Sequence, residues 1–309
     1  MFRSLWGVLA AQDGALALSP HLSLETALPA VAALGYDGVE APVKLAMMVG
    51  EDKFKGLLAE NGLSLVAMVF TDGPVAPGGS LWGPMANHPE PGPGVDAHLD
   101  CFMAQVEVAR GLDAVAINSH SGNDWWTPDE ADSFFKAAMG FDDTVMHETH
   151  RKRYLHSPWV GRDLVARHSS LKLVADLSHW VNVAETDTDD AMLTSVIEGV
   201  ASNVHHIHGR IGYDHGPQVP DPRAPEWRPY LEGHLRWWQS IWQAQAARGQ
   251  GVSTFTPEHG PPNYQIALPY SRMPVADIWA VNHFVAMEAQ KAFAKDFGDA
   301  STSNLKPLE

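Results

Sequence analysis

The feature that most constrains the fold of this chain is a regular alternation of short apolar runs with longer stretches of helical periodicity. Eight runs are short, apolar and rich in β-branched residues, as buried parallel strands are. They cover residues 5–10, 38–41, 64–70, 114–118, 144–147, 172–175, 204–207 and 252–255. The stretches between them, residues 23–34, 52–61, 95–110, 128–139, 159–168, 189–200, 231–248 and 275–293, have the apolar spacing of helices. About eight strand–helix units in order predict an α/β fold, a single (β/α)8 TIM barrel over residues 1–309.

A doubly wound parallel sheet is the rival architecture for such an alternation. It is disfavoured because no Gly-x-Gly-x-x-Gly segment follows the first apolar run. A length of 309 residues would permit two domains, but barrels of this size are commonly one.

Four of the apolar runs are followed closely by a side chain that can bind a metal ion: Glu148, Asp176, His208 and Glu258. The carboxyl ends of all strands in a (β/α)8 barrel open on one face, so these side chains are expected to converge there. Three carboxylates and one imidazole suit a hard or borderline divalent ion such as Mn²⁺ or Mg²⁺ better than a structural zinc. The alternative for the acids is a set of structural salt bridges with Arg151, Arg153 or Arg210.

The alternation of side chains along a strand separates the histidines of the seventh run. Residues two apart share a face, so His206 and His208 point the same way and His205 points the opposite way. We expect His208, nearest the strand end, to be the metal ligand and His206 to be its neighbour in the pocket. By the same rule His147 faces away from Glu148.

The charge of the chain restricts its partners. With 21 basic and 37 acidic residues the formal net charge is −16, which argues against nucleic acid or an anionic membrane as the main partner. Cys101 is the only cysteine, so no internal disulfide can form. No apolar stretch approaches the roughly 20 residues of a membrane span, and the first residues lack a cleavage pattern. A cytoplasmic location is the expectation.

Two connections are unusually long, residues 71–94 and residues 209–227, and both are rich in proline and glycine. Both follow predicted strands, so both are expected on the catalytic face, over the active site. The alternative for the first is a disordered linker.

Several segments together resemble a known family. Asp176-Leu-Ser-His179 looks like the Asp-x-x-His segment of the xylose isomerase-like TIM barrels, the sugar phosphate isomerase/epimerase superfamily. Residues 35–40, the His206–His208 strand and Glu258 resemble the second, seventh and eighth strand segments of that family. The resemblance covers essentially the whole chain.

The resemblance implies a set of roles. Glu148, Asp176, His208 and Glu258 match the metal ligands of the family. Glu148 and Glu258 also match the carboxylate pair that moves a proton on opposite faces of an enediolate, so we expect both to be catalytic. His179 matches the substrate-binding histidine. The chain departs from the epimerases at Arg210, which lies two residues after the ligand histidine rather than several.

The remaining substrate contacts are expected from position. Arg210 is expected to hold a polar group of the substrate, with His206 beside it. His120, at the end of the fourth run, and the nearby Trp125 and Trp126 are placed to contact sugar hydroxyls and the apolar face of a sugar. A surface loop that only caps the following helix is the alternative for this segment.

The expected function is a divalent-metal-dependent isomerase or epimerase that moves a proton next to a carbonyl of a small carbohydrate. Mn²⁺ is the favoured cofactor, with Mg²⁺, Co²⁺ and Zn²⁺ as alternatives. The second hypothesis is a metal-dependent lyase that works by β-elimination on a 3-oxo-glycoside, like the C-glycoside deglycosidase subunits of the family, together with a small partner subunit. A homo-oligomer is the other assembly considered. An AP endonuclease would need several zinc ions and a basic face, and a non-catalytic binding protein would not need two carboxylates flanking the metal.

Overall fold

The computed structural model describes residues 1–6, 8, 23–71, 94–298 and 304–308. Its eight strands form one parallel sheet in the order β1 to β8, and β8 returns to lie against β1. The strands are β1 (Phe2–Ser4), β2 (Gly38–Pro42), β3 (Ser64–Phe70), β4 (Ala116–His120), β5 (Met146–Glu148), β6 (Lys172–Ala175), β7 (Val204–His208) and β8 (Thr254–Thr256). The predicted (β/α)8 TIM barrel is confirmed.

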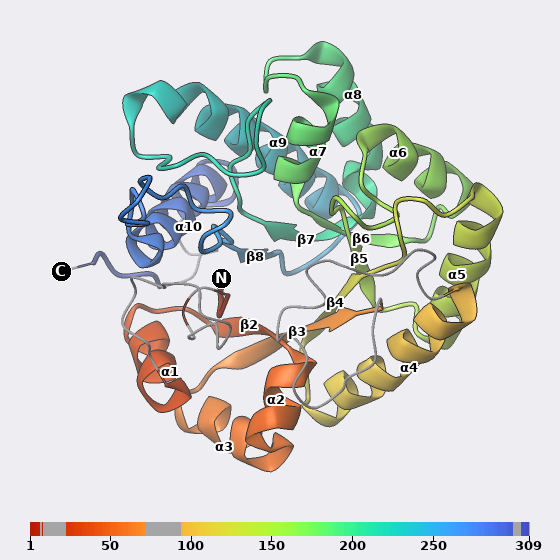
Figure 1. Ribbon diagram of the computed structural model, residues 1–309, viewed down its shortest axis with the longest axis horizontal. Coiled ribbons are helices and arrows are strands. Elements are labelled where there is room, and N and C mark those ends of the chain that lie inside the picture. The colour runs from red at the N-terminus through yellow and green to blue at the C-terminus, as the bar shows by residue number, and fades with distance from the viewer. Residues whose placement is uncertain (7, 9–22, 72–93, 299–303, 309) are drawn as a thin grey trace.

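Helices surround the strands, as Figure 1 shows. They are α1 (Leu24–Ala33), α2 (Val43–Val49), α3 (Glu51–Glu60), α4 (Val95–Gly111), α5 (Pro128–Phe141), α6 (Pro158–Arg167), α7 (Leu177–Ala184), α8 (Ala191–Val200), α9 (Arg228–Ala247) and α10 (Ile278–Phe297), with short 3₁₀ turns at Ala201–Asn203 and Pro225–Trp227. The core lies between this ring and the outer side of the barrel, where α9 packs Trp238 edge-on against Phe255 of β8 at 4.9 Å between ring centres. Burial of such apolar side chains is the main force that holds the layers together.

The first predicted strand was wrong in position. The pairing with β2 joins Phe2 to Gly38 and Ser4 to Glu40, so the strand is Phe2–Ser4 rather than residues 5–10. The search for apolar runs missed this strand because it contains Arg3. The guanidinium of Arg3 is nevertheless buried and lies 4.5 Å from the ring centre of Trp279. Residues 7, 9 and 10 of that predicted run lie outside the described residues.

The other predicted strands are confirmed in order, with small errors at their ends. β4, β5, β7 and β8 continue one or two residues past the predicted ends, because polar residues there still pair with the neighbouring strand. Helices α2 and α7 were not predicted. Helix α7 begins directly after β6 because the side chain of Asp176 caps it, accepting from the Ser178 amide at 3.1 Å.

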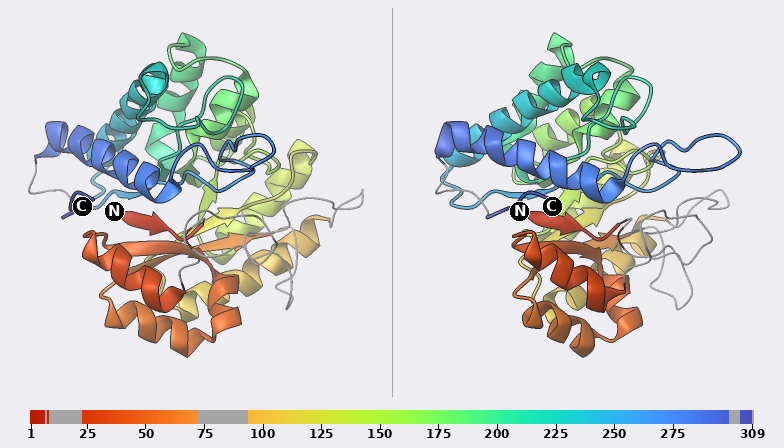
Figure 2. Two further views of the ribbon diagram at one scale, coloured as in Figure 1. Left: turned by 60° about the vertical axis from the view of Figure 1, so that its left-hand side comes forward. Right: turned by 90° about the vertical axis from the view of Figure 1, so that its left-hand side faces the viewer.

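The segment between β8 and α10, residues 257–277, projects from the barrel as the blue loop at the right of the right-hand view in Figure 2. It begins next to Glu258, so the chain beyond β8 starts at the face where the strand ends open. Within the described residues, no helix is long and apolar enough to cross a membrane.

Candidate metal centre

The four predicted ligands lie together at the carboxyl ends of consecutive strands. Glu148 is the last residue of β5, Asp176 follows β6, His208 is the last residue of β7 and Glu258 comes two residues after β8. One ligand atom from each lies within 4.8 Å of the others, and all four side chains are buried. The parallel order of the strands therefore produces the convergence that the sequence predicted.

The donor atoms of this cluster are suited to a cation. Within the described part of the chain, Glu148 Oε1 is buried and makes no hydrogen bond. His208 Nδ1 lies 3.0 Å from Glu258 Oε2 and 3.6 Å from Glu148 Oε2. Buried polar atoms are almost always satisfied in native proteins, so Glu148 Oε1 needs a further partner, and a cation would satisfy it together with the close His208 and Glu258 pair. A divalent ion with oxygen and imidazole ligands fits the donor set.

Burial and neighbouring charges shift the pKa values of Glu148 and Glu258 in opposite directions. Burial alone would raise the pKa of Glu148, but the charges of His120 and His208 hold it well below its ordinary value. Burial raises the pKa of Glu258, and His208 and Arg210 offset that only in part. The pKa of His208 lies well above its ordinary value: burial opposes the charged ring, but Glu258, Glu40 and Glu148 favour it. The surroundings thus push the pKa values of the two carboxyls in opposite directions.

Arg210 lies in the site and binds two of the candidate ligands. Its Nε donates to Asp176 Oδ2 at 3.1 Å, its Nη2 makes a shorter bond to the same oxygen, and Nη2 lies 3.3 Å from Glu258 Oε2. Its guanidinium stacks 4.8 Å from the ring centre of Tyr264 and 5.4 Å from that of Trp6. Arg210 Nη1 is buried and makes no hydrogen bond among the described residues. Contact between Arg210 and a substrate stays a prediction.

Three further histidines border the cluster. His120 Nε2 lies 2.9 Å from Glu148 Oε2, and the rings of His120 and His150 lie 5.0 Å apart. The His150 ring packs 3.9 Å from that of His179, whose Nε2 lies 3.0 Å from Arg210 Nη2. Burial and the neighbouring cations lower the pKa of His150 and His179 well below the ordinary value. The structure therefore brings His120, His179 and His150 to the metal cluster.

The position of His206 differs from the expected one. Its Nδ1 lies 2.7 Å from Thr254 Oγ1 and its Nε2 lies 3.0 Å from Thr256 Oγ1, so both nitrogens are engaged by β8. It shares the face of His208, as alternation predicts, but it lies one step deeper in the barrel. This geometry favours a role for His206 in holding neighbouring side chains in place. Contact between His206 and a substrate stays a prediction.

Sequence reasoning missed two buried side chains at the cluster. Glu40 Oε1, from β2, lies 2.9 Å from His208 Nε2. Asn118, from β4, donates from Nδ2 to Glu148 Oε2 at 2.7 Å and to Glu40 Oε1 at 3.2 Å. The signal for Glu40 was present, since it is an acid within a short run whose other residues are apolar. Asn118 carried no comparable signal, because a single amide in a strand is common.

Only one of the two long connections can be placed. Residues 72–93 of the first lie outside the described residues. The second, residues 209–227, is tied to the segment after β8: the Gln218 side chain donates to the Gly260 carbonyl at 3.1 Å and accepts from its amide at 2.7 Å. This contact joins residues 209–227 to the segment that contains Glu258, and the position of the loop over the active site stays a prediction.

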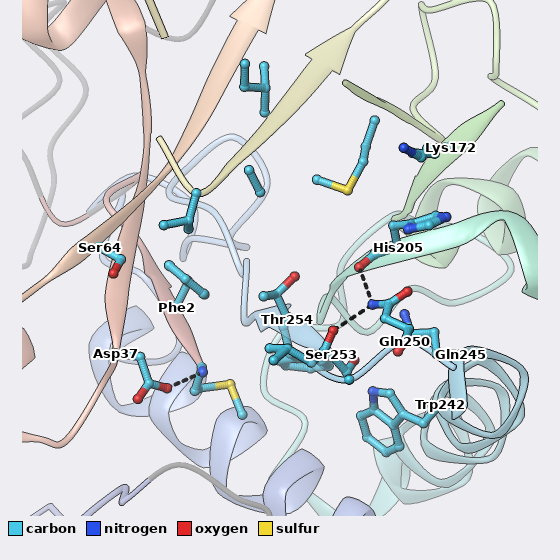
Figure 3. Close-up of a pocket in the computed structure, with 18 of the residues that line it drawn as sticks. Phe2, Asp37, Ser64, Lys172, His205, Trp242, Gln245, Gln250, Ser253 and Thr254 are labelled. Carbon is cyan, nitrogen blue, oxygen red and sulfur yellow. Dashed lines mark hydrogen bonds and ion pairs between the residues drawn. The ribbon is translucent and has the colours of Figure 1, made fainter. Parts of the chain in front are cut away.

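A hollow with a volume of about 950 Å³ lies at the end of the barrel opposite the metal cluster. Figure 3 shows Phe2, Ser64 and Lys172, each at or near the start of its strand, around it, together with His205. It is therefore remote from the carboxylate cluster. His205 points away from His208, as predicted, and His147 likewise turns outward, where its ring packs 5.0 Å from that of Phe135.

Comparison with known proteins identifies the family. The model of the xylose isomerase-like TIM barrel family matches residues 28–268, and this chain belongs to that family. The resemblance inferred from the sequence is confirmed. A search of curated proteins found no match.

Solved structures share the fold at low sequence identity. A D-allulose 3-epimerase from Methylomonas sp. in complex with D-allulose has a TM-score of 0.53 at 12% identity, over 90% of this chain and 91% of that one. The 3-keto-D-glucoside 4-epimerase from E. coli has a TM-score of 0.52 at 12% identity, over 94% and 98%. Endonuclease IV from Thermus thermophilus has a TM-score of 0.52 at 14% identity, over 88% and 95%. At these identities the likeness establishes the fold alone.

Proposed function

We propose that this protein is a divalent-metal-dependent isomerase or epimerase of a small carbohydrate. The observation that carries the proposal is the buried cluster of Glu148, Asp176, His208 and Glu258, with ligand atoms within 4.8 Å of one another. These residues would hold the ion, for which Mn²⁺ is the favoured candidate. When bound, it would supply Lewis-acid stabilisation of the oxyanion that forms as a proton leaves the carbon next to a carbonyl.

The two glutamates are assigned the proton transfers. Glu148, whose pKa is lowered, is ionised and can accept a proton from the substrate carbon. Glu258, the candidate ligand that follows β8, is assigned the return of the proton to the neighbouring carbon or to the opposite face. Environments that push the pKa values of two carboxyls apart are a general way to divide acid and base roles. Microscopic reversibility exchanges the roles in the reverse reaction.

The cations and imidazoles around the cluster are assigned to substrate binding. Arg210 Nη1 has no hydrogen bond among the described side chains and can donate to a substrate oxygen. His120 and His179 lie beside Glu148 and Arg210 respectively, where they can bind hydroxyls. Two of the structural relatives are epimerases of a ketose and of a 3-keto-glucoside, which supports a polyhydroxylated carbonyl compound as the substrate class.

A metal-dependent lyase acting on a 3-oxo-glycoside is the second candidate. It is favoured by the imidazoles of His120 and His150 next to Glu148, which could protonate a leaving group after the same proton abstraction. The charge of −16 disfavours the nuclease activity of the endonuclease IV relative.

The test is proton exchange followed by NMR. Metal-loaded protein in D₂O would be incubated with a panel of ketoses and 3-oxo-glycosides. We expect deuterium to enter next to the carbonyl of at least one compound, and the exchange to stop in chelator. Release of an aglycone along with exchange would favour the lyase, and metal binding without exchange on any panel member would favour a non-catalytic binding protein. Glu258→Gln should exchange much more slowly than the wild type. Its matched carboxylate-to-amide control is Asp142→Asn, at the other end of the barrel.

A further inference from the structure

The two ring nitrogens of His208 face different surroundings. Nδ1 points into the cluster of candidate ligands, 3.0 Å from Glu258 Oε2. Nε2 points the other way, 2.9 Å from Glu40 Oε1 and 3.0 Å from Glu40 Oε2. The ring thus bridges the proposed metal centre and a carboxylate that is not among its predicted ligands.

Glu40 is held firmly behind that ring. Its side chain is fully buried, and its backbone pairs with β1 and β3 on either side. Asn118 Nδ2 donates to Glu40 Oε1 at 3.2 Å, and His206 Nε2 lies 3.6 Å from Oε2. The same Asn118 group donates to Glu148 at 2.7 Å, so it fixes the distance between the two carboxylates.

The tautomer of His208 follows from this geometry and from the proposed cation. A neutral imidazole carries one N–H and one lone pair, and a carboxylate can only accept. Carboxylates lie at hydrogen-bond distance from both nitrogens, Glu40 at Nε2 and Glu258 at Nδ1. A cation bound by Glu258 and the other candidate ligands would need the Nδ1 lone pair, so the proton would be on Nε2, where Glu40 accepts it. Carboxylates commonly orient metal-binding histidines in this way.

We propose that Glu40 is a positioning residue that holds His208 with Nε2 protonated, so that Nδ1 is the metal-binding atom. The inference rests on the metal centre proposed above, but not on the reaction assigned to it. Glu40 would contribute through His208 and would not touch the metal or the substrate.

Two substitutions separate the hydrogen bond from the charge. In Glu40→Gln, the donor Asn118 requires the amide oxygen at the Oε1 position, so His208 Nε2–H keeps its acceptor. In Glu40→Met, the acceptor is lost while an unbranched side chain of similar length remains. Asp142→Asn serves as the control, because this carboxylate pairs with Arg110 at the opposite end of the barrel.

Two readouts test the proposal without any substrate. The dissociation constant for Mn²⁺ would be measured by titration, and the coordinating nitrogen would be identified by ¹⁵N NMR of histidine-labelled, Zn²⁺-loaded protein. We expect coordination through Nδ1 with the proton on Nε2 in the wild type and in Glu40→Gln. Glu40→Met should weaken Mn²⁺ binding by about 10- to 100-fold, the usual cost of losing such a partner, Glu40→Gln by less, and Asp142→Asn not at all.

The outcomes separate this inference from the proposed function. Coordination through Nε2 in the wild type, or an unchanged dissociation constant in Glu40→Met, would overturn the inference; the wild-type spectrum decides even where Glu40→Met does not fold. Coordination through Nδ1 in a protein that exchanges no substrate proton would overturn the isomerase proposal and leave this one standing. Wild-type protein that binds no metal would overturn both.

Discussion

The buried pair of Asp176 and Arg210 yields the sharpest prediction about stability. Asp176 Oδ2 accepts two hydrogen bonds from Arg210, while Oδ1 accepts from the Ser178 amide at 3.1 Å and from its hydroxyl at 2.5 Å. Asp176→Asn keeps an oxygen that can cap α7, but it removes the charge opposite a guanidinium that is 1% exposed. Glu258, 3.3 Å away, is the other carboxylate facing Arg210.

Breaking a buried ion pair by removal of one partner costs about 3 to 5 kcal/mol. Because Glu258 stays in place, we expect a loss near the lower end, about 3 kcal/mol of the free energy of unfolding. The measurement is equilibrium urea unfolding in the presence of chelator, so that metal binding does not contribute. In Asp142→Asn the altered side chain is 8% exposed, but its partner Arg110 is 41% exposed and also pairs with Glu107. The Asn oxygen can keep the bonds to Thr144, so the cost should be smaller, about 1 kcal/mol.

A double-mutant cycle with Arg210→Met measures the interaction energy between Asp176 and Arg210 apart from their other contacts. If the two residues stabilise each other, the loss of unfolding free energy in the double variant should be smaller than the sum of the losses in the two single variants. The difference, which is the coupling energy, should be about 1 to 3 kcal/mol. A loss below about 1 kcal/mol in Asp176→Asn, or a cycle without coupling, would refute the claim that this pair is part of the structural frame of the site.

Three further predictions concern catalysis, metal binding and pH. Glu258→Gln should lose turnover by roughly 10² or more even when it is reloaded with metal; full activity of the metal-loaded variant would assign the proton transfer to another base. His208→Ala should weaken Mn²⁺ binding in titrations whereas His205→Ala should not, and equal effects would contradict the strand alternation. Burial lowers the pKa of His234 to about 4, so the unfolded chain binds the extra proton and wild-type stability should fall as pH drops from about 6.5 towards 4. This loss should reach roughly 3 kcal/mol relative to His234→Gln in unfolding curves, and parallel pH profiles would contradict it.

The sequence was sufficient to predict the barrel and the convergence of the four candidate ligands, because both follow from the periodicity of the apolar runs. Apolar runs at regular spacing define strands, and a polar residue just past a buried run must lie at the carboxyl end of the barrel. It was weakest where a strand contains its own polar residues. The strand β1 was misplaced because it contains Arg3, and Glu40 was given no role because it lies in the middle of β2, whereas Glu148 is the last residue of β5.

The hydrogen-bond partners could not be predicted, since they depend on contacts across the barrel. Glu40 and His208 are separated by 168 residues along the chain, and Asn118 reaches both Glu40 and Glu148 from a third strand. Alternation placed His206 on the correct face, but only the structure shows that the β8 hydroxyls of Thr254 and Thr256 engage both of its nitrogens.

Elemental analysis of purified protein tests the central claim most directly, since the account requires a divalent ion held by the four strand-end residues. The wild type should retain one tightly bound divalent ion per chain after desalting, with Mn²⁺ favoured when several metals are offered. The Glu148→Gln, Asp176→Asn double variant, compared with Asp142→Asn as a control, should retain almost none. Equal metal content in the wild type and the double variant, or no bound metal in the wild type, would contradict the account.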